Sequence, residues 1–421
     1  MHSAMTLRAA RGWAFLAVLC MICSGCAREA QRPVATDVPS PAGPGSGEPH
    51  LSVGPDGRFW LSWIEPAAAK AEHVLSIAHR RPGGAWSAPI RVAAGAGWFV
   101  NWADFPSLLA LPDGSLTAHW LVKSGDGPYA YDVRVSRSAD GGATWSAPVT
   151  PHRDGTASEH GFVSLYPGEA GRVGLVWLDG RGTVGSAGHD DDDDDTPTSG
   201  AMTLRHAVLA ADGSLTEEVE LDPRVCDCCQ TAAVSAGDRV LVAYRDRSEH
   251  EIRDISLLRR HAGRWSAPEP LSKDGWEIRG CPVNGPAIDA SGFDVAVAWF
   301  SAPAGAGRVR VVLSHDAGER FDAPIAVDDG QPLGRVDVLA LGDGGALVSW
   351  LEAVGGGAQL RLRRVGRDGS RGPALGVAET GAARSSGFPR IALSGAEVLM
   401  AWTDAAAPSR VRTAVLPVPQ T

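Results

Sequence analysis

Four cysteines outside the first 26 residues have the residue type and spacing most suited to chemistry. Three of them, Cys226, Cys228 and Cys229, fall within four positions, and the fourth is Cys281. An even number of cysteines in an exported chain is typical of disulfide bonds. Disulfides among three such close neighbours would close only very short loops, so they would constrain the unfolded chain little.

Two further chemistries fit this spacing. Cys226 and Cys229 have the separation of a redox pair, and Cys228 and Cys229 could form a strained vicinal disulfide. Clustered thiolates also bind soft metal ions, so copper(I) or zinc is the cofactor that the cluster suggests. We expect Cys281 to pair with one of the other three, and we leave open whether the remaining two form a disulfide or bind a metal.

The densest polar segment of the chain is residues 244–254, which contains Arg245, Asp246 and Arg247. Its opposite charges could simply pair with one another, which adds little stability at a surface. Alternatively, its guanidinium groups could bind an anionic ligand. We predict a ligand site in which these three residues are joined by polar residues of other loops, namely Asp104, Glu159, Asn284, Arg335 and Arg384.

Such distant residues need a scaffold that brings them together, and a repeated hairpin supplies one. Pro112-Asp113-Gly114 separates two apolar runs; proline presets φ and glycine accepts positive φ, which predicts a tight turn. The period-two pattern on both sides predicts a β-hairpin. A third alternating run, residues 132–136, follows, and there is room for a fourth strand after Pro148.

The hairpin recurs along the chain at intervals of about 50 to 67 residues. A repeat of about 50 residues with four strands per unit is typical of a β-propeller blade. Seven units favour seven blades, with six as the alternative, and a strand from residues 33–38 could close the ring. An aromatic residue in the second strand marks each unit: Trp63, Trp120, Trp177, Tyr244, Trp299, Trp350 and Trp402.

The turn after the third strand of two units resembles the Asp-box of the sialidase (BNR-repeat) superfamily. One copy has Ser138, Asp140, Gly142 and Trp145, and the other has Ser314, Asp316, Gly318 and Phe321. The resemblance implies a propeller in which these residues fold a turn away from the ligand face. It also implies that loops entering first strands and leaving second strands converge on one ligand-binding mouth.

Sialidase activity is a weaker implication of this resemblance. Such enzymes use three arginines, a tyrosine nucleophile with a glutamate, and an aspartate as acid/base, but no tyrosine follows Tyr244 in this chain. We therefore expect a sialidase-like propeller that binds a glycan or small anionic ligand at its mouth. The alternatives are an exo-sialidase or other glycoside hydrolase acting on acidic sugars, and a redox or soft-metal protein. No catalytic residue is assigned.

The N-terminal segment predicts export. Arg8 and Arg11 precede a short apolar run that ends at Cys26 in a sequence resembling a bacterial lipobox. We expect residues 1–26 to be a signal peptide, Cys26 to be lipidated, residues 27–48 to be a flexible tether and residues 49–421 to be the propeller. The expected location is the cell envelope, on the outer membrane facing the periplasm.

Charge restricts the partners. The net charge is −10 with 39 Lys and Arg, and no basic cluster with interleaved aromatic residues occurs, so nucleic acid is not expected as a partner. The run from Asp190 to Asp195 predicts a solvated loop. We expect a monomer that meets the membrane only through its lipid anchor and binds a glycan or small molecule.

Overall fold

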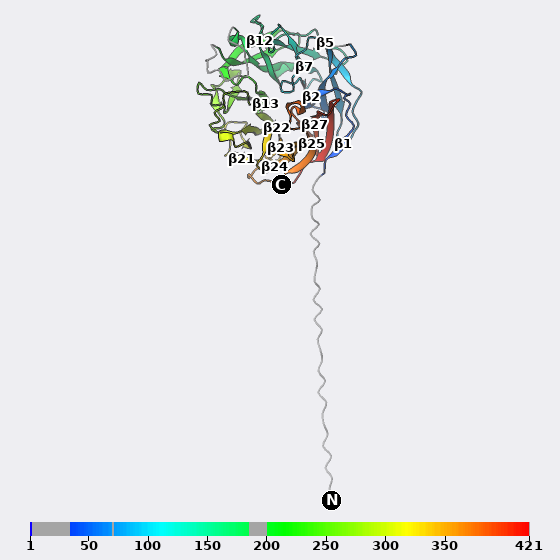
Figure 1. Ribbon diagram of the computed structural model, residues 1–421, viewed down its shortest axis with the longest axis vertical. Helices are drawn as coiled ribbons and strands as arrows, with labels where there is room; N and C mark the ends of the chain where they lie inside the picture. Colours follow the sequence, from blue (N-terminus) through cyan, green and yellow to red (C-terminus); the bar gives the residue numbers. More distant parts are fainter. Residues whose placement is uncertain (2–33, 70, 185–199, 421) are drawn as a thin grey trace. The chain divides into compact units, whose positions relative to one another are not determined.

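The computed structural model describes Met1 and residues 34–69, 71–184 and 200–420 of the chain. Within these ranges the chain is all-β, and its strands form seven antiparallel sheets. Figure 1 shows the sheets arranged around a common centre, with the colours following the ring in chain order. The predicted seven-bladed β-propeller is confirmed, and the six-bladed alternative is wrong.

Each sheet is one blade, and its first strand lies nearest the ring axis. The first three blades are β2 (Gly47–Val53), β3 (Phe59–Pro66), β4 (Glu72–Arg80), β5 (Ile90–Ala96); β6 (Ser107–Ala110), β7 (Leu116–Lys123), β8 (Tyr131–Ser138); and β9 (His160–Pro167), β10 (Val173–Asp179), β11 (Met202–Leu209), β12 (Leu215–Val225). The next two are β13 (Ala232–Ala236), β14 (Arg239–Arg245), β15 (Ile255–His261), β16 (Arg264–Trp265), β17 (Glu269–Pro270); and β18 (Ala287–Ser291), β19 (Asp294–Ser301), β20 (Arg308–Ser314), β21 (Ile325–Ala326). The last two are β22 (Pro332–Ala340), β23 (Ala346–Val354), β24 (Gly357–Val365), β25 (Leu375–Thr380); and β26 (Arg390–Ser394), β27 (Glu397–Asp404), β28 (Arg410–Pro417), with β1 (Thr36–Val38) outermost.

The ring closes by pairing the two ends of the described chain. β1 is antiparallel to β28, with Thr36 opposite Val415 and Val38 opposite Thr413. In Figure 1 this blue strand lies beside the red strands of the last blade. The closing strand is therefore the one that the sequence suggested, and the last blade has its full four strands only because β1 joins it.

Local sequence explains the hairpins. At the turn between β6 and β7, Leu111 N–H donates to Ser115 O and Gly114 N–H donates to Leu111 O, both at 2.9 Å, and Gly114 adopts φ 81°. Asp113 Oδ1 accepts the backbone N–H of Ser115 at 2.9 Å. An aspartate that binds the backbone two residues later and a glycine at positive φ fix this turn, as the Pro-Asp-Gly sequence predicts.

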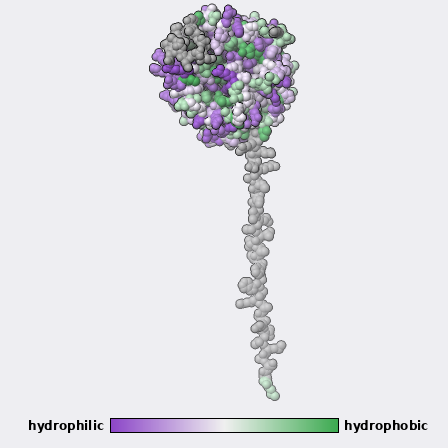
Figure 2. All heavy atoms as spheres, in the orientation of Figure 1, coloured by the Kyte–Doolittle hydropathy of each residue, from purple (hydrophilic) through white to green (hydrophobic). Residues whose placement is uncertain are grey.

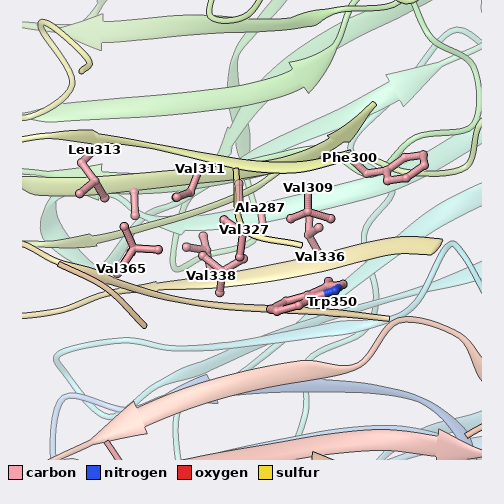
Figure 3. Close-up of a cluster of buried hydrophobic side chains, with 14 of the residues drawn as sticks. Ala287, Phe300, Val309, Val311, Leu313, Val327, Val336, Val338, Trp350 and Val365 are labelled. Carbon is pink, nitrogen blue, oxygen red and sulfur yellow. The ribbon is translucent and has the colours of Figure 1, made fainter. Parts of the chain in front are cut away.

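The hydrophobic core lies between neighbouring blades. Figure 3 shows one such layer, in which Val309 and Val311 of β20 face Val336 and Val338 of β22, with Trp350 packed below them. Trp63, Trp177, Trp299 and Trp350, four of the aromatics that mark the repeat, are completely buried. Burial of large aromatic side chains at the same position in each unit is what holds adjacent sheets together.

Two features differ from the expected pattern. The blade of β6–β8 has three strands, and its fourth position is filled only by an isolated bridge between Val135 and Val149. Residues 34–48, expected to be a flexible tether, belong to the ring: they contain β1 and the start of β2, and Ala42 is buried. Pro- and Gly-rich composition here reflects an irregular path along the last blade, where Gly45 N–H donates to Ser409 O at 2.7 Å.

Helical structure in the described chain is limited to single 3₁₀ turns between strands. They are η1 (Glu169–Gly171), η2 (Arg181–Thr183), η3 (Pro303–Gly305) and η4 (Arg384–Ser386). Among the described residues, no helix has the length and apolar character needed to cross a bilayer. Figure 2 shows polar and apolar side chains interspersed over the visible face of the propeller.

Candidate functional site

Antiparallel pairing places the polar loops of all blades at one end of the sheets. The loops that enter first strands and those that leave second strands lie at this end, which we call the mouth; the opposite end is the far face. At the mouth, isolated β-bridges connect the ends of strands to neighbouring loops. Tyr131 pairs with Glu159, and Val225 pairs with Asp246. The mouth is therefore a connected layer rather than a set of separate loops.

The four cysteines meet at the mouth. Cys226, Cys228 and Cys229 lie in the loop between β12 and β13, and their three Sγ atoms lie within 4.8 Å of one another. The Sγ atoms of Cys226 and Cys229 are 3.2 Å apart. A hydrogen bond with Cys228 lowers the pKa of Cys281, so the fourth thiol adjoins the other three. All four are free thiols in this structure, and Cys281 is the exposed one.

A buried guanidinium stabilises one thiolate. Nη1 of Arg253 lies 3.3 Å from Cys226 Sγ, and Nη2 lies 2.8 Å from Glu251 Oε2. Burial opposes ionisation of Cys226, but hydrogen bonds from Cys228 and Cys229 together with Arg253 lower its pKa well below the usual value. Cys226 is therefore the first of the group to become a thiolate. Arg253 was not among the predicted site residues.

Neighbouring loops hold the cysteine loop in place. The side chain of Gln230 donates to Ala103 O at 2.6 Å and accepts from Gly285 N–H at 3.0 Å, so it links three loops of different blades. A Cβ at Gly285 would clash with the backbone of Gln230, so glycine is required for this close approach. Cys226 N–H donates to Arg245 O at 3.1 Å. The loop is thus fixed before any ligand arrives.

Asp104 and Glu159, two predicted ligand-binding residues, meet at one phenol. Tyr131 Oη lies 3.0 Å from Asp104 Oδ2 and 2.9 Å from Glu159 Oε1. One hydroxyl proton serves only one acceptor, so the other carboxyl must carry its own proton. Burial raises the pKa of Asp104 to about 7 and that of Glu159 well above its usual value. Tyr131 is buried and stacks on Phe99.

The predicted arginines are engaged by the protein itself. Arg245 is 1% exposed, and its guanidinium donates to three backbone carbonyls. Its Nε and Nη2 bind Asn284 O at 3.0 and 2.7 Å, Nη2 also binds Phe300 O at 2.6 Å, and Nη1 binds Arg253 O at 2.5 Å. Arg245 therefore joins two mouth loops to the end of β19 and has little capacity left for a ligand anion.

The next two residues behave in the same way. Arg247 pairs with Asp227 at 3.0 Å and with Glu251 at 2.8 Å. Asp246 accepts from Ser256 Oγ at 3.1 Å, and burial raises its pKa. The charged groups of Asp246 and Arg247 therefore pair with their own loop and with the cysteine loop. This pairing is the alternative to ligand binding that the sequence suggested for the segment.

The remaining three candidates adjoin one another, and Asn284 also connects them to Arg245. Asn284 Oδ1 accepts from Arg335 N–H at 2.7 Å, and Arg335 Nη1 donates to Ala383 O at 3.0 Å. The guanidinium of Arg335 also lies 5.0 Å from the Trp102 ring centroid. Burial and the charge of Arg384 lower the pKa of Arg335 to about 10. Arg384 is exposed, so it is the predicted arginine best placed to meet a ligand.

The two Asp-box-like turns lie at the far face, after third strands β8 and β20. Asp140 accepts from Ser138 Oγ, Thr144 N–H and Thr144 Oγ1 at 2.7–2.8 Å. Asp316 accepts from Ser314 Oγ at 2.8 Å and from Arg320 N–H at 3.0 Å. These bonds agree with a turn-forming role. That the two turns are copies of a family motif stays a prediction.

Sequence reasoning missed a second polar group at the mouth, which combines two buried histidines with three aspartates. Their loops had been recognised in part, but the spacing of His152 and Asp154 gave no familiar signature. The expected lipidation site Cys26 and the acidic run Asp190–Asp195 lie outside the described residues. The members of the missed group are Asp132, His152, Asp154, His160 and Asp179.

Comparison with known proteins gives structural neighbours only. No protein-family profile matches the chain, and no curated protein matches it. A protein of unknown function from Dyadobacter fermentans has a TM-score of 0.51 at 13% identity, covering 92% of this chain and 98% of its own. The polysaccharide lyase Uly1 has a TM-score of 0.53 at 9% identity, with coverages of 88% and 89%. A mutant NanB sialidase from Streptococcus pneumoniae has a TM-score of 0.47 at 10% identity, with coverages of 86% and 83%. Sialidases and polysaccharide lyases are thus among the structural neighbours of this propeller, and at these identities the likeness concerns the fold alone.

Proposed function

We propose that this protein binds a soft metal ion, copper(I) or zinc, at its mouth through Cys226, Cys228 and Cys229. The observation that carries the proposal is the convergence of three sulfur atoms within 4.8 Å, with a fourth thiol alongside. Zinc–sulfur bonds of about 2.3 Å place tetrahedral thiolates roughly 3.8 Å apart. The sulfur–sulfur distances here run from 3.2 Å to no more than 4.8 Å, a range that includes this value. Binding a metal ion therefore needs only small side-chain adjustments.

The charges around the cluster suit this role. Thiolates must lose their protons to bind a metal, and Arg253 already favours the ionised form of Cys226. Hydrogen bonds within the group raise the pKa of Cys228, and burial together with the hydrogen bond to Cys226 raises that of Cys229, so these two release their protons only when a cation takes the place of the proton. Cys281, exposed and on a separate loop, supplies the fourth ligand or is displaced by a partner.

The test uses the full chain purified under reducing, oxygen-free conditions. We expect one equivalent of copper(I) or zinc per chain after desalting, measured by elemental analysis, and protection of the thiols from alkylation. Cys226→Ser should abolish retention, whereas Cys281→Ser should weaken affinity and leave the fold intact. Asp140→Asn, on the far face, is the matched control and should bind as the unaltered protein does.

Two results would contradict the metal proposal. One is a chain that retains no metal and whose four thiols alkylate at the same rate with and without the ion. The other is a stable disulfide recovered by peptide mapping of protein alkylated without reductant, which would favour the redox alternative. The sulfur atoms of Cys226 and Cys229 would then have to close from 3.2 Å to about 2.05 Å.

A glycan ligand is the second candidate function, and one observation favours it. Glu159 is half-buried at the mouth, and burial, together with the nearby Asp104, raises its pKa, which is the property of a general acid for sugar chemistry. Incubation with fluorogenic sialosides and with uronic acid polysaccharides tests it. Activity that is lost in Glu159→Gln but retained in Cys226→Ser would establish this function instead.

Export and lipid anchoring at Cys26 belong to the same proposal. A mouth lined with thiols in an oxidising compartment would need a metal or a disulfide to stay in one state. Labelling of the expressed protein with a radioactive fatty acid, lost in Cys26→Ala, is the expected result. Retention of the label in that variant would remove the anchor from the proposal.

A further inference from the structure

A second cluster at the mouth contains no sulfur and is built differently. It joins the blade of β6–β8 to the blade of β9–β12, and its central residue is His160, the first residue of β9. His160 Nε2 lies 3.2 Å from Asp154 Oδ2 and 3.8 Å from Asp179 Oδ1. The side chains of His160 and Asp179 are fully buried, and that of Asp154 is 8% exposed.

The hydrogen bonds of His160 determine which ring nitrogen carries the proton and which one presents its lone pair to the carboxylates. Its Nδ1 lies 3.3 Å from the carbonyl oxygen of Tyr131, which can only accept, so Nδ1 carries the proton. In the neutral ring Nε2 is then an acceptor, and it points at two further acceptors. Among the described residues, neither His160 Nε2 nor Asp154 Oδ2 has a hydrogen-bond partner. A buried arrangement of acceptors alone requires a positive charge between them.

Arg181 supplies part of that charge but does not occupy the gap. Its Nε and Nη2 donate to the two oxygens of Asp179 at 2.7 Å, and Nη2 lies 3.3 Å from Asp154 Oδ2. Arg205 Nε also lies 3.9 Å from Asp179 Oδ2, but neither guanidinium is a hydrogen-bond partner of His160 Nε2 or Asp154 Oδ2. These two unpartnered acceptor atoms are what a bound cation would satisfy.

Two more residues hold the cluster in position: His152 contacts His160, and Thr156 binds Asp154. The ring of His152 stacks on that of His160, with centroids 3.7 Å apart and an interplanar angle of 2°. Val133 N–H donates to His152 Nε2 at 3.3 Å, which leaves the proton of His152 on Nδ1, 3.6 Å from Asp154 Oδ2. Thr156 fixes Asp154 by donating from its backbone N–H to Oδ1 at 2.9 Å.

The geometry points to a divalent transition-metal site formed by Asp154, His160 and Asp179. Bonds of about 2.1 Å to nitrogen and oxygen place tetrahedral ligands roughly 3.4 Å apart, and the separations of 3.2 and 3.8 Å fit around one such ion. One imidazole and two carboxylates suit Mn(II), Fe(II) or Zn(II), whereas the sulfur cluster selects softer ions. The site does not depend on the metal proposed for the cysteines.

The experiment titrates the full chain with Mn(II) and follows free ion by electron paramagnetic resonance. Mn(II) is the probe because it prefers oxygen and nitrogen ligands and avoids thiolates, so the cysteine site stays silent. We expect one saturable equivalent, which Zn(II) displaces. The equivalent should disappear in His160→Gln and in Asp154→Asn. The chain also contains the acidic run Asp190–Asp195, so loss in these variants is what assigns the binding.

His119→Gln is the matched control. His119 is equally buried, with Nδ1 2.8 Å from Ser107 Oγ, and it also leaves Nε2 without a partner among the described residues, but it belongs to none of the metal-binding clusters found among them. This variant should keep the Mn(II) equivalent. Binding that survives in both His160→Gln and Asp154→Asn, or that is lost equally in His119→Gln, overturns the proposal, as does the absence of any saturable equivalent.

Asp154→Asn also separates the metal site from a simple ion pair. The new amide would donate to His160 Nε2 across the 3.2 Å gap and satisfy it without a metal. The proposal therefore expects the melting temperature in chelator to rise in this variant. If His160 is instead an imidazolium paired with Asp154, the variant should melt at a lower temperature, and that result would count against a metal at this position.

Discussion

Two aspartates at opposite ends of one blade, Asp104 at the mouth and Asp140 on the far face, show how differently the two ends treat a carboxyl group. Asp140 is exposed and accepts three hydrogen bonds at 2.7–2.8 Å, which lower its pKa to about 2. Asp104 is buried with two donors, Phe162 N–H and Tyr131 Oη, and its pKa rises to about 7. The turn on the far face satisfies the carboxylate of Asp140 locally, whereas burial at the mouth favours the protonated form of Asp104.

The contrast teaches where reactivity can arise in this propeller. A turn that satisfies its own polar atoms is a stable structural unit and has nothing left for a ligand. At the mouth, thiols, carboxyls and imidazoles from different blades meet in groups. In these groups, hydrogen-bond acceptors outnumber the available donors and protons. Perturbed groups of this kind cluster at functional sites more often than elsewhere. The following predictions test whether this division between the two ends holds.

The largest effect should come from Arg245→Met, which removes the guanidinium that joins two mouth loops to the end of β19. Three buried carbonyl groups would lose their donors, and each unsatisfied group costs about 1–3 kcal/mol. We expect the free energy of unfolding to fall by roughly 3–9 kcal/mol for the three groups together, measured by urea denaturation. Arg264→Met, at an exposed arginine of the same blade, should change it little. A similar loss in both variants would show that the hydrogen bonds of Arg245 contribute no more to the free energy of unfolding than an exposed arginine does.

A smaller effect is expected from the titration of Asp104. Its folded-state pKa of about 7 lies above the unfolded value, so the folded protein holds a proton that the unfolded chain has released. Stability from this group is complete below about pH 4 and is lost as the pH rises through 7. Relative to Asp104→Asn, the protein should lose up to about 4 kcal/mol over this range. Denaturation curves at pH 4 to 8 measure it, and a constant difference would refute the buried, protonated carboxyl.

The smallest effect, with the opposite pH dependence, should come from Asp140→Ala. Its folded pKa of about 2 lies below the unfolded value, so its contribution is complete above about pH 4 and disappears as the pH falls through 2. We expect a melting temperature a few degrees lower at neutral pH, converging with the unaltered protein near pH 2. Metal retention should not change. Loss of metal at an unchanged melting temperature would instead place this turn in the functional site.

Much of the fold could be predicted because it depends on patterns that repeat within the chain. The aromatic at Trp63, Trp177 or Trp350 has the same environment in each blade, so its spacing alone gave the blade count. The topology of a blade then placed Cys226 and Cys281 at one end, and the structure brings them together. Asp104 and Glu159 were likewise chosen by topology, and they meet at Tyr131.

The parts that could not be predicted depend on contacts between blades. The partners of Arg245 are backbone carbonyls, which have no sequence signature, so a structural arginine looked like a ligand-binding one. His152 and His160 stack because two loops of different blades approach each other, and nothing in either loop specifies the other. Local sequence sets turns and strands, but it does not determine which buried groups lack a partner.

The pairing of β1 with β28 has a consequence for how the chain folds. β1 is the first strand of the described chain and β28 is its last, so closing the ring means closing a very long loop, which adds to the entropy cost of folding. Propellers with such non-local contacts fold slowly. Six blades can form while the chain is still being synthesised. The seventh blade requires β26, β27 and β28 together with β1. Until then the edges of the first and last sheets are open to other chains, which makes the unfinished ring the stage most exposed to aggregation.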